Sequence, residues 1–268
     1  MHIVALIPHP KTALSSLLIA DAASAVEPGS TITALHVCVD PAKIGGSVEE
    51  VDMQEMRIRD EGTAFQRRNE VRKIFEEWSA GREPSPAGAK VEWVEADGGE
   101  EDGVRKHLGS ADLVTIAHPQ SMDGGDALHA ALFDHHRLVV FTPDTNGTPV
   151  SFGRSIAIFW RDDDGIRSCL QKARAWLRAA DTLIILAAHE NDISEAVAFF
   201  QTLHVSGTGR LQTSVAKNAD DFLEKANRGG ADTLLMGAYR HGLFLETVFG
   251  GATKTVMDHT SLPVFLSH

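Results

Sequence analysis

The sequence predicts an α/β protein built from two tandem, doubly wound halves, each with a parallel five-stranded sheet. Short continuous apolar runs, such as 3–7, alternate with segments whose apolar residues recur at helical spacing. Such runs are typical of parallel strands that helices cover on both faces. The same order of elements restarts at 155, after a turn-rich linker at 144–149. We therefore expect one half at 1–147 and the other at 152–268.

In the first half, apolar and β-branched runs predict strands at 3–7, 31–39, 91–94, 113–117 and 138–141. A helix follows the first strand and ends near Pro28 and Gly29, and shorter helices are expected at 101–108 and 127–133. Residues 47–80 are highly charged with scattered apolar members, which predicts one long helix or two, closed by Gly81.

The second half repeats this order, with strands expected at 155–160, 182–186, 211–215, 233–236 and 262–266. Its helical segments carry apolar stripes at 166–177, around 196–203 and at 222–226. Because strands and helices alternate throughout, both sheets are expected to be parallel with helices on both faces.

Offsets between paired positions of the two halves support a duplication. The offset is 153 on the first strand, 151 on the second, 120 on the third and 124 on the fifth. The paired positions are His2 and Ser155, Thr31 and Thr182, Val91 and Leu211, and Leu138 and Leu262. One large drop, at the charged segment where the first half carries about thirty extra residues, explains most of the change.

Charge and cysteine content limit the classes of function. A net charge of −12 argues against nucleic acid or an anionic membrane as a partner. The two cysteines, Cys38 and Cys169, form no disulfide framework and no CxxC pair, which indicates a reducing compartment. The start of the chain lacks a basic leader, and no apolar run approaches the roughly 18 residues of a membrane span. We expect a cytoplasmic protein.

The most informative stretch lies near the C-terminus. Residues 231–242 read ADTLLMGAYRHG, a short apolar strand followed by a glycine-bearing turn. Residues 249–256 read FGGATKTV, in which a glycine pair opens a helix, and LPVFL follows at 262–266. Free backbone N–H groups at the start of such a helix can bind a phosphate.

This stretch resembles the signature end of the universal stress protein (UspA) family. The nucleotide-binding members of that family carry Gly-x2-Gly-x9-Gly-Ser/Thr between the fourth strand and the last helix. Gly237 matches the first glycine and Gly250 the third. Arg240 stands in place of the second glycine and Gly251 in place of the final Ser/Thr, with Thr253 two residues further on.

The resemblance implies the adenine nucleotide alpha hydrolase-like fold and a bound ATP or AMP, with nucleotide-associated magnesium as the only metal. Backbone amides around Gly237 and at Gly250, Gly251, Ala252 and Thr253 would face the phosphates, and Thr253 could donate its hydroxyl. Two roles are open for Arg240. Its side chain blocks the phosphate site sterically, or its guanidinium binds the phosphate through two hydrogen bonds.

The family's adenine and ribose side uses an acidic residue at the end of the first strand. In the second half a run of three aspartates follows that strand, so the candidates are Asp162 and Asp163. The alternative is that these carboxylates cap the helix that begins near Ile166, where they complement the helix dipole.

The first half has lost the motif, because its first strand ends in Pro8-His9-Pro10 and its glycine pair, Gly124 and Gly125, stands at the wrong spacing. We expect this half to be structural. The fifth-strand edges, 139–141 and 264–266, are apolar and aggregation-prone if open, so they are expected to pair inside one chain as an internal pseudo-dimer. A homodimer of the whole chain is left open.

Three functions are compatible with the sequence and with this resemblance. The first is a non-catalytic stress-response module with an altered nucleotide site in the second half. The second is a scaffold that binds no nucleotide. The third is an ATP-hydrolysing enzyme on the same fold, which needs a Ser-Gly-Gly-x-Asp-Ser type of loop that neither first strand supplies.

Overall fold

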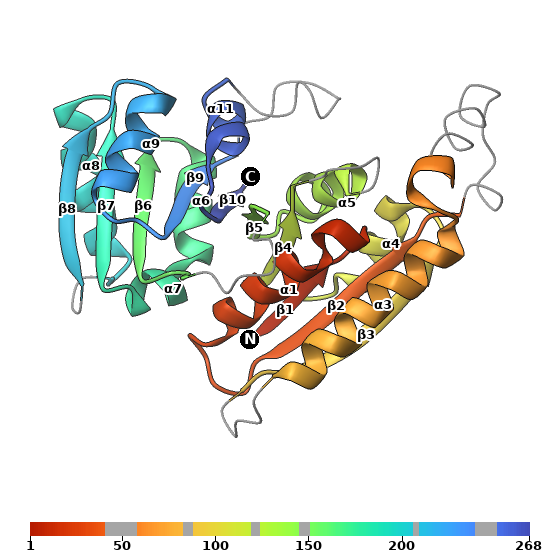
Figure 1. Ribbon diagram of the computed structural model, residues 1–268. Coiled ribbons are helices and arrows are strands. Elements are labelled where there is room, and N and C mark those ends of the chain that lie inside the picture. The colour runs from red at the N-terminus through yellow and green to blue at the C-terminus, as the bar shows by residue number, and fades with distance from the viewer. Residues whose placement is uncertain (41–57, 83–87, 119–123, 145–150, 206–208, 239–250) are drawn as a thin grey trace.

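The computed structural model describes residues 1–40, 58–82, 88–118, 124–144, 151–205, 209–238 and 251–268. The described residues form a ten-stranded sheet in the order β3-β2-β1-β4-β5-β10-β9-β6-β7-β8 (Figure 1). The first-half strands are β1 His2–Leu6, β2 Thr31–Cys38, β3 Lys90–Asp97, β4 Leu113–Ala117 and β5 Val139–Thr142. The second-half strands are β6 Ser155–Trp160, β7 Thr182–Ala187, β8 Arg210–Val215, β9 Thr233–Gly237 and β10 Val264–Ser267.

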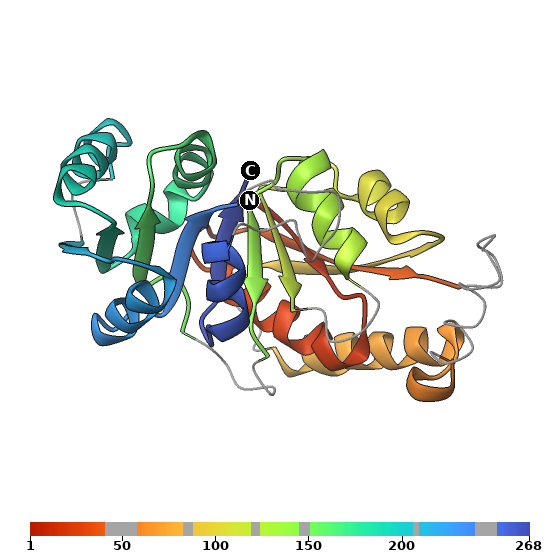
Figure 2. The same ribbon diagram turned by 90° about the horizontal axis from the view of Figure 1, so that it is seen from above.

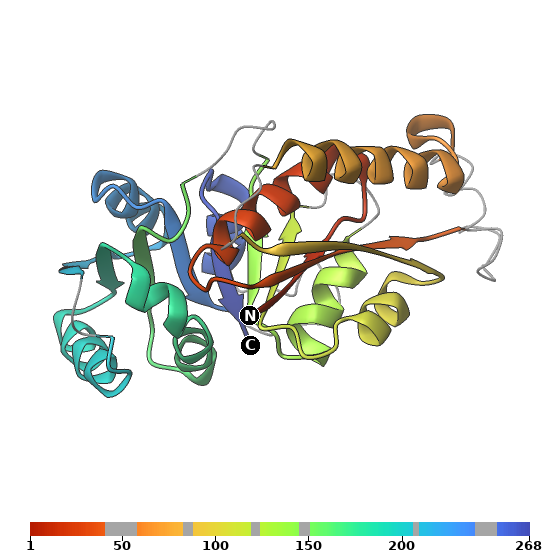
Figure 3. The same ribbon diagram turned by 90° about the horizontal axis from the view of Figure 1, so that it is seen from below.

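Within each half all neighbouring strands are parallel, and helices cover both faces of the sheet (Figures 2 and 3). One hydrophobic core lies under α1 Pro10–Ser24, α3 Ala64–Gly81, α6 Asp164–Lys172, α7 Arg174–Ala179 and α8 Glu190–Thr202. The second lies under α4 Glu100–His107, α5 Gly125–His129, the π-helical turn η1 Ala130–Asp134, α9 Ala219–Arg228 and α11 Gly251–His259. None of the described helices is long and apolar enough to cross a membrane.

The sheet register tests the duplication directly. Val91 pairs with Ile32 and Leu211 pairs with Leu183, which are counterparts at the expected offsets of 120 and 151. The offset of 124 at the fifth strand is wrong by one residue. Val139 lies beside Val114, and its counterpart beside Leu234 is Val264, so the true offset is 125. The apolar run that starts at 262 contains a proline, which has no N–H to donate, and β10 begins only after it.

The expected pairing of the fifth-strand edges is confirmed. β5 and β10 are antiparallel, with Val139 opposite Leu266, Val140 opposite Phe265 and Phe141 opposite Val264. Val140 and Phe265 are counterparts at the offset of 125, so a pseudo-two-fold axis relating the halves passes between them. The two edges that would be open in separate halves therefore complete one continuous sheet.

Side chains reinforce this junction. Phe265 is fully buried, and its ring centre lies 5.4 Å from that of Trp176. The indole N–H of Trp176 donates to the carbonyl of Ala23, on a helix of the other half, at 3.0 Å. Lys172 Nζ donates to the carbonyl of His136 and to the hydroxyl of Ser267, both at 2.7 Å. The halves are joined by packed rings and by hydrogen bonds as well as by strand pairing.

Local differences from the expected elements are small. The helix expected at 127–133 begins at Gly125 and changes to a π-helical turn at Ala130. The stripe expected at 166–177 is split into two helices at Ala173. In the charged segment the structure describes α3, and residues 41–57 lie outside the described part.

Candidate functional site

The second-half candidate site lies at the carboxyl ends of β6 and β9. These strands are neighbours, yet β6 connects to β7 on one side while β9 lies on the other, so the strand order reverses between them. In open α/β sheets, ligands bind outside the carboxyl ends of the strands at such a reversal. Asp162 and Asp163 follow β6, and Gly237 ends β9.

Asp163 is the N-cap of α6. Its Oδ1 accepts the backbone N–H of Ile166 at 3.0 Å, so the capping alternative raised by the sequence is confirmed. Its Oδ2 is shielded from solvent and accepts no hydrogen bond from the described residues, with Arg161 Nε at 4.0 Å. Burial raises the pKa of the Asp163 carboxyl above its usual value, against the opposing effect of the hydrogen bond from Ile166.

Asp162 is exposed and orients an arginine. Its Oδ1 accepts from Arg167 Nε at 2.6 Å, and this hydrogen bond lowers the pKa of the Asp162 carboxyl. The Arg167 guanidinium lies 5.8 Å from the ring centre of Trp160 and 4.7 Å from that of Phe199. The sequence pattern gave no sign of this arrangement, because Phe199 is on α8, far from Trp160 in sequence.

Gly237 brings β9 against the start of α6. A Cβ at Gly237 would lie 2.8 Å from the nitrogen of Ile166 and 3.1 Å from the carbonyl carbon of Gly165. It would also lie 3.3 Å from Asp163 Oδ1. The structure therefore places two predicted site residues, Gly237 and Asp163, in contact. It also gives the glycine a packing reason that is independent of any ligand.

Helix α11 supplies the other side of the candidate site. Gly251 is the first described residue of the helix, and a Cβ there would meet no atom of the described residues within 4 Å. Thr253 is fully buried, and its hydroxyl has no hydrogen-bond partner among the described residues. The first N–H groups of a helix also lack partners within the helix. Arg240, Gly250 and the side chain of Ala252 lie outside the described residues, as does the packing around them.

The matching helix start in the first half is already occupied by a carboxylate. Glu100, only 6% exposed, accepts the N–H of Gly124 through Oε1 at 2.7 Å and that of Ala127 through Oε2 at 3.2 Å. In the second half α9 takes the place of α4, and its acidic second residue, Asp220, is exposed. Sequence reasoning missed Glu100, because an acidic residue in a first turn reads as a partner of its own helix dipole.

In the first half His9 has the helix-capping role that Asp163 has in the second, although the first-strand offset of 153 pairs it with Asp162. It is the N-cap of α1, and its Nδ1 accepts the N–H of Lys11 at 3.2 Å. Its Nε2 faces Glu61 Oε2 at 3.7 Å. Among the described residues, no group of three or more His, Cys, Asp or Glu side chains is arranged to hold a metal ion.

Comparisons with known proteins place the fold. No protein-family model and no curated protein matches the sequence. Among solved structures, a universal stress protein from Archaeoglobus fulgidus DSM 4304 superimposes with a TM-score of 0.63 at 13% identity, covering 99% of this chain and 95% of that one. A putative universal stress protein from Pseudomonas aeruginosa UCBPP-PA14 gives 0.52 at 15% identity, covering 99% and 92%. The chain therefore has the universal stress protein fold over nearly its whole length, as the sequence predicts.

Proposed function

We propose that this chain is a tandem universal stress protein, a non-catalytic stress-response module of the cytoplasm that binds ATP or AMP in its second half. The fold likeness to universal stress proteins supports the family, and the signature-like stretch at 231–266 supports the half. Magnesium would enter only with the nucleotide phosphates.

The buried hydroxyl of Thr253 is the observation that carries the nucleotide proposal. A buried polar group without a partner costs about 1–3 kcal/mol, so its retention calls for an explanation. A phosphate oxygen at the start of α11 would accept this hydroxyl and the first N–H groups of the helix. Asp163 Oδ2, which also lacks a hydrogen-bond partner among the described residues, would accept a ribose hydroxyl.

Arg240 and Gly250 enter the proposal from the sequence motif. The two alternatives for Arg240, a steric block or a bidentate phosphate ligand, predict opposite effects of Arg240→Gly on affinity. Gly250→Val tests whether the third motif glycine is needed for binding while the fold survives.

Equilibrium dialysis with ATP and AMP tests the proposal, using Thr253→Val as the central variant. Valine fills the same space without a hydroxyl, so the fold is kept while a hydrogen bond to a charged ligand is lost. Such a bond contributes about 1.5–3 kcal/mol, or roughly a 10- to 150-fold change in affinity. The matched control is Thr255→Val on the same helix, because that hydroxyl already donates to the carbonyl of Gly251 at 2.8 Å.

Three results would count against the proposal. Absence of binding at millimolar nucleotide would leave a scaffold without nucleotide. Unchanged affinity in Thr253→Val would put the site elsewhere. Steady ATP turnover that Thr253→Val removes would instead favour an enzyme on the same fold.

A further inference from the structure

A cluster of basic and polar side chains lies at the seam where the two halves of the sheet meet. Figures 2 and 3 show the end of β10 between the helices α6 and α7 of the second half and the helix formed by α5 and η1 in the first. Because β5 and β10 are antiparallel, the start of one strand lies beside the end of the other. The seam cluster consists of Lys172 on α6, His136 and Arg137 before β5, Ser267 at the end of β10, and His268 after it.

Hydrogen-bond donors gather around the Lys172 ammonium. Two of its three N–H groups donate to the carbonyl of His136 and to the hydroxyl of Ser267, both at 2.7 Å. The third has no acceptor among the described residues. The Ser267 hydroxyl lies 3.3 Å from that of Ser168, which is partly exposed, and the rings of His136 and His268 stack with centres 5.7 Å apart. The ammonium therefore keeps a donor for an external acceptor.

The positive charges of the seam cluster are not balanced by ion pairs. Neither Lys172 nor Arg137 forms an ion pair with a carboxylate in the described part of the chain. Arg137 donates instead to two backbone carbonyls, at 2.6 and 3.4 Å. The carboxylate nearest in sequence, that of Asp134, lies 3.8 Å from Arg105 on α4. The seam therefore carries uncompensated positive charge in a chain whose net charge is −12.

The pKa of the Lys172 ammonium agrees with this description. It is lowered, chiefly by partial burial and further by the charge of Arg137, against the opposing effect of the Cys169 thiol. A carboxylate close to the ammonium would raise the pKa instead. The charge of Lys172 is therefore held at the seam without an anionic partner from the described residues.

His136 is held in a conformation that residues with a side chain seldom adopt. Its φ of 47° lies in the left-handed region. Its carbonyl accepts from Lys172, and the residue is exposed. Asparagine and aspartate are the residues that tolerate this region best after glycine, so they provide a matched pair of substitutions at this position.

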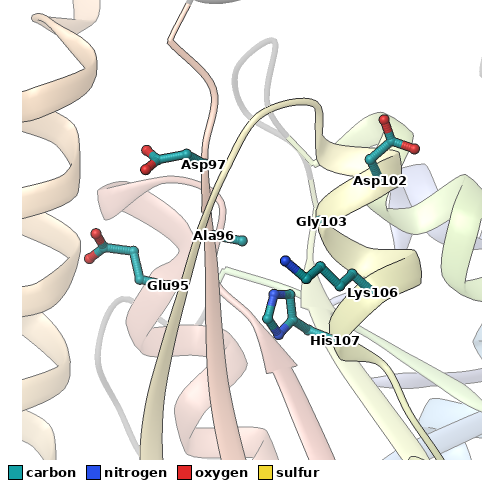
Figure 4. A pocket seen from close by; sticks show the side chains of 7 residues that line it. All are labelled: Glu95, Ala96, Asp97, Asp102, Gly103, Lys106 and His107. Atoms are coloured by element: carbon teal, nitrogen blue, oxygen red, sulfur yellow. The ribbon is translucent and has the colours of Figure 1, made fainter.

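A second group of side chains with a lysine has the opposite balance of charge. A cavity of about 390 Å³ lies between the end of β3 and α4, and Figure 4 shows Lys106 extending from α4 toward β3. Three carboxylates share its lining, those of Glu95, Asp97 and Asp102. Because these carboxylates outnumber the lysine, this cavity does not favour an anion. Lys106 is therefore a suitable control for Lys172.

We propose that the seam cluster binds a phosphate group, either as inorganic phosphate or as the phosphate of a small phosphomonoester. Lys172 Nζ and the ring of His136 would contact its oxygens, and Arg137 would act through its charge. A phosphate group offers three acceptor oxygens and close to two negative charges, which suits two unpaired cations better than a carboxylate does. The inference is independent of the nucleotide site, which lies at the start of α11.

The test is an NMR titration of the full chain with inorganic phosphate, following the ring C–H resonances of His136 and His268. Phosphate is mostly dianionic near pH 7.5, and about 50 mM salt keeps electrostatic screening modest. We expect both resonances to shift with one dissociation constant below about 10 mM. Acetate should bind at least about five-fold more weakly, because it carries a single charge. Glycerol phosphate separates the two sources: tighter binding than inorganic phosphate indicates a phosphomonoester, and weaker binding indicates the free ion.

Lys172→Met should weaken phosphate binding by about tenfold or more, the loss expected for a hydrogen bond between charged groups. Lys172→Arg should stay within about three-fold of the native chain, because the charge is kept. Lys106→Met should leave the affinity unchanged.

A second pair of variants keeps Lys172 in place. His136→Asp should abolish binding, because it puts a carboxylate beside the ammonium, whereas His136→Asn should retain binding within about five-fold. Both are followed through the His268 resonance, with circular dichroism confirming that each variant folds.

The inference fails on any of four results. Unshifted His136 and His268 resonances at about 50 mM phosphate would mean that the seam holds no phosphate site. Native affinity in Lys172→Met or in His136→Asp would remove the charge argument. Loss of phosphate binding in Thr253→Val would put the phosphate at the start of α11. Binding that appears only when two glycines are added after His268 would make the carboxylate at that end of the chain the occupant.

Discussion

Gly237→Ala tests whether the first motif glycine is held by packing. The added Cβ would lie 2.8 Å from the nitrogen of Ile166, whereas ordinary contacts begin at 3.4 Å, so β9 and the start of α6 must separate by roughly 0.6 Å. Both partners are backbone atoms of regular elements and cannot rotate away. Overpacking of this kind costs about 1–3 kcal/mol of unfolding free energy.

The matched variant is Gly251→Ala, at the other motif position. No atom of the described residues lies within 4 Å of a Cβ there, and alanine in a compatible helical position stabilises by about 0.4–1 kcal/mol. Urea unfolding followed by circular dichroism should therefore give a lower midpoint for Gly237→Ala and an equal or higher one for Gly251→Ala. If Gly237→Ala proved neutral, or if both variants lost stability equally, the packing explanation would be wrong.

Three further predictions concern stability. Burial lowers the pKa of His36, against the opposing effect of a hydrogen bond to the carbonyl of Ile7. On acidification His36 is therefore protonated in the unfolded chain first, and the free energy of unfolding should fall below about pH 6.5 by up to about 1.4 kcal/mol per pH unit. Urea unfolding at pH 7.5 and 5.5 should show this slope in the native chain and not in His36→Gln. Glu100→Ala leaves two buried N–H groups unpaired and should lower the free energy of unfolding by about 2–3 kcal/mol. Glu100→Gln keeps an acceptor and should lower it less, so equal urea midpoints for the two variants would contradict this prediction. Phe265→Ala should lower the free energy of unfolding by about 3–5 kcal/mol, because the ring is fully buried at the junction of the halves. A decrease of less than about 1 kcal/mol in calorimetric unfolding would show that the junction is not a cooperative part of the core.

Most of the fold could be predicted because it depends on local patterns repeated twice. Apolar runs defined the strands, and the offsets placed counterparts such as Val91 and Leu211 at equivalent register. The slip at the fifth strand arose because Leu262 continues the apolar run although pairing begins only at Val264. Apolar composition alone does not reveal where backbone pairing starts.

The sequence allowed individual residues of the candidate site to be predicted, but not which of them lie next to each other. Asp163 was foreseen as a helix cap and Gly237 as a motif glycine, but their contact depends on β6 and β9 being neighbours. Strand order comes from the topology of the whole sheet, which no local pattern contains. Glu100 shows the same limit, because its hydrogen bonds reach a helix start 24 and 27 residues further along the chain.

The two halves share strand order and register, so a difference in ligand binding has to come from the connecting segments and side chains at the carboxyl ends of the strands. In the first half Glu100 brings a fixed carboxylate to the N–H groups of Gly124 and Ala127, and an external anion would have to displace it. In the second half no described carboxylate bonds to the start of α11, where Thr253 offers a neutral hydroxyl. Internal capping and anion binding use the same backbone groups and therefore compete. A duplicated fold can assign one copy to each, which is why we expect nucleotide only in the second half.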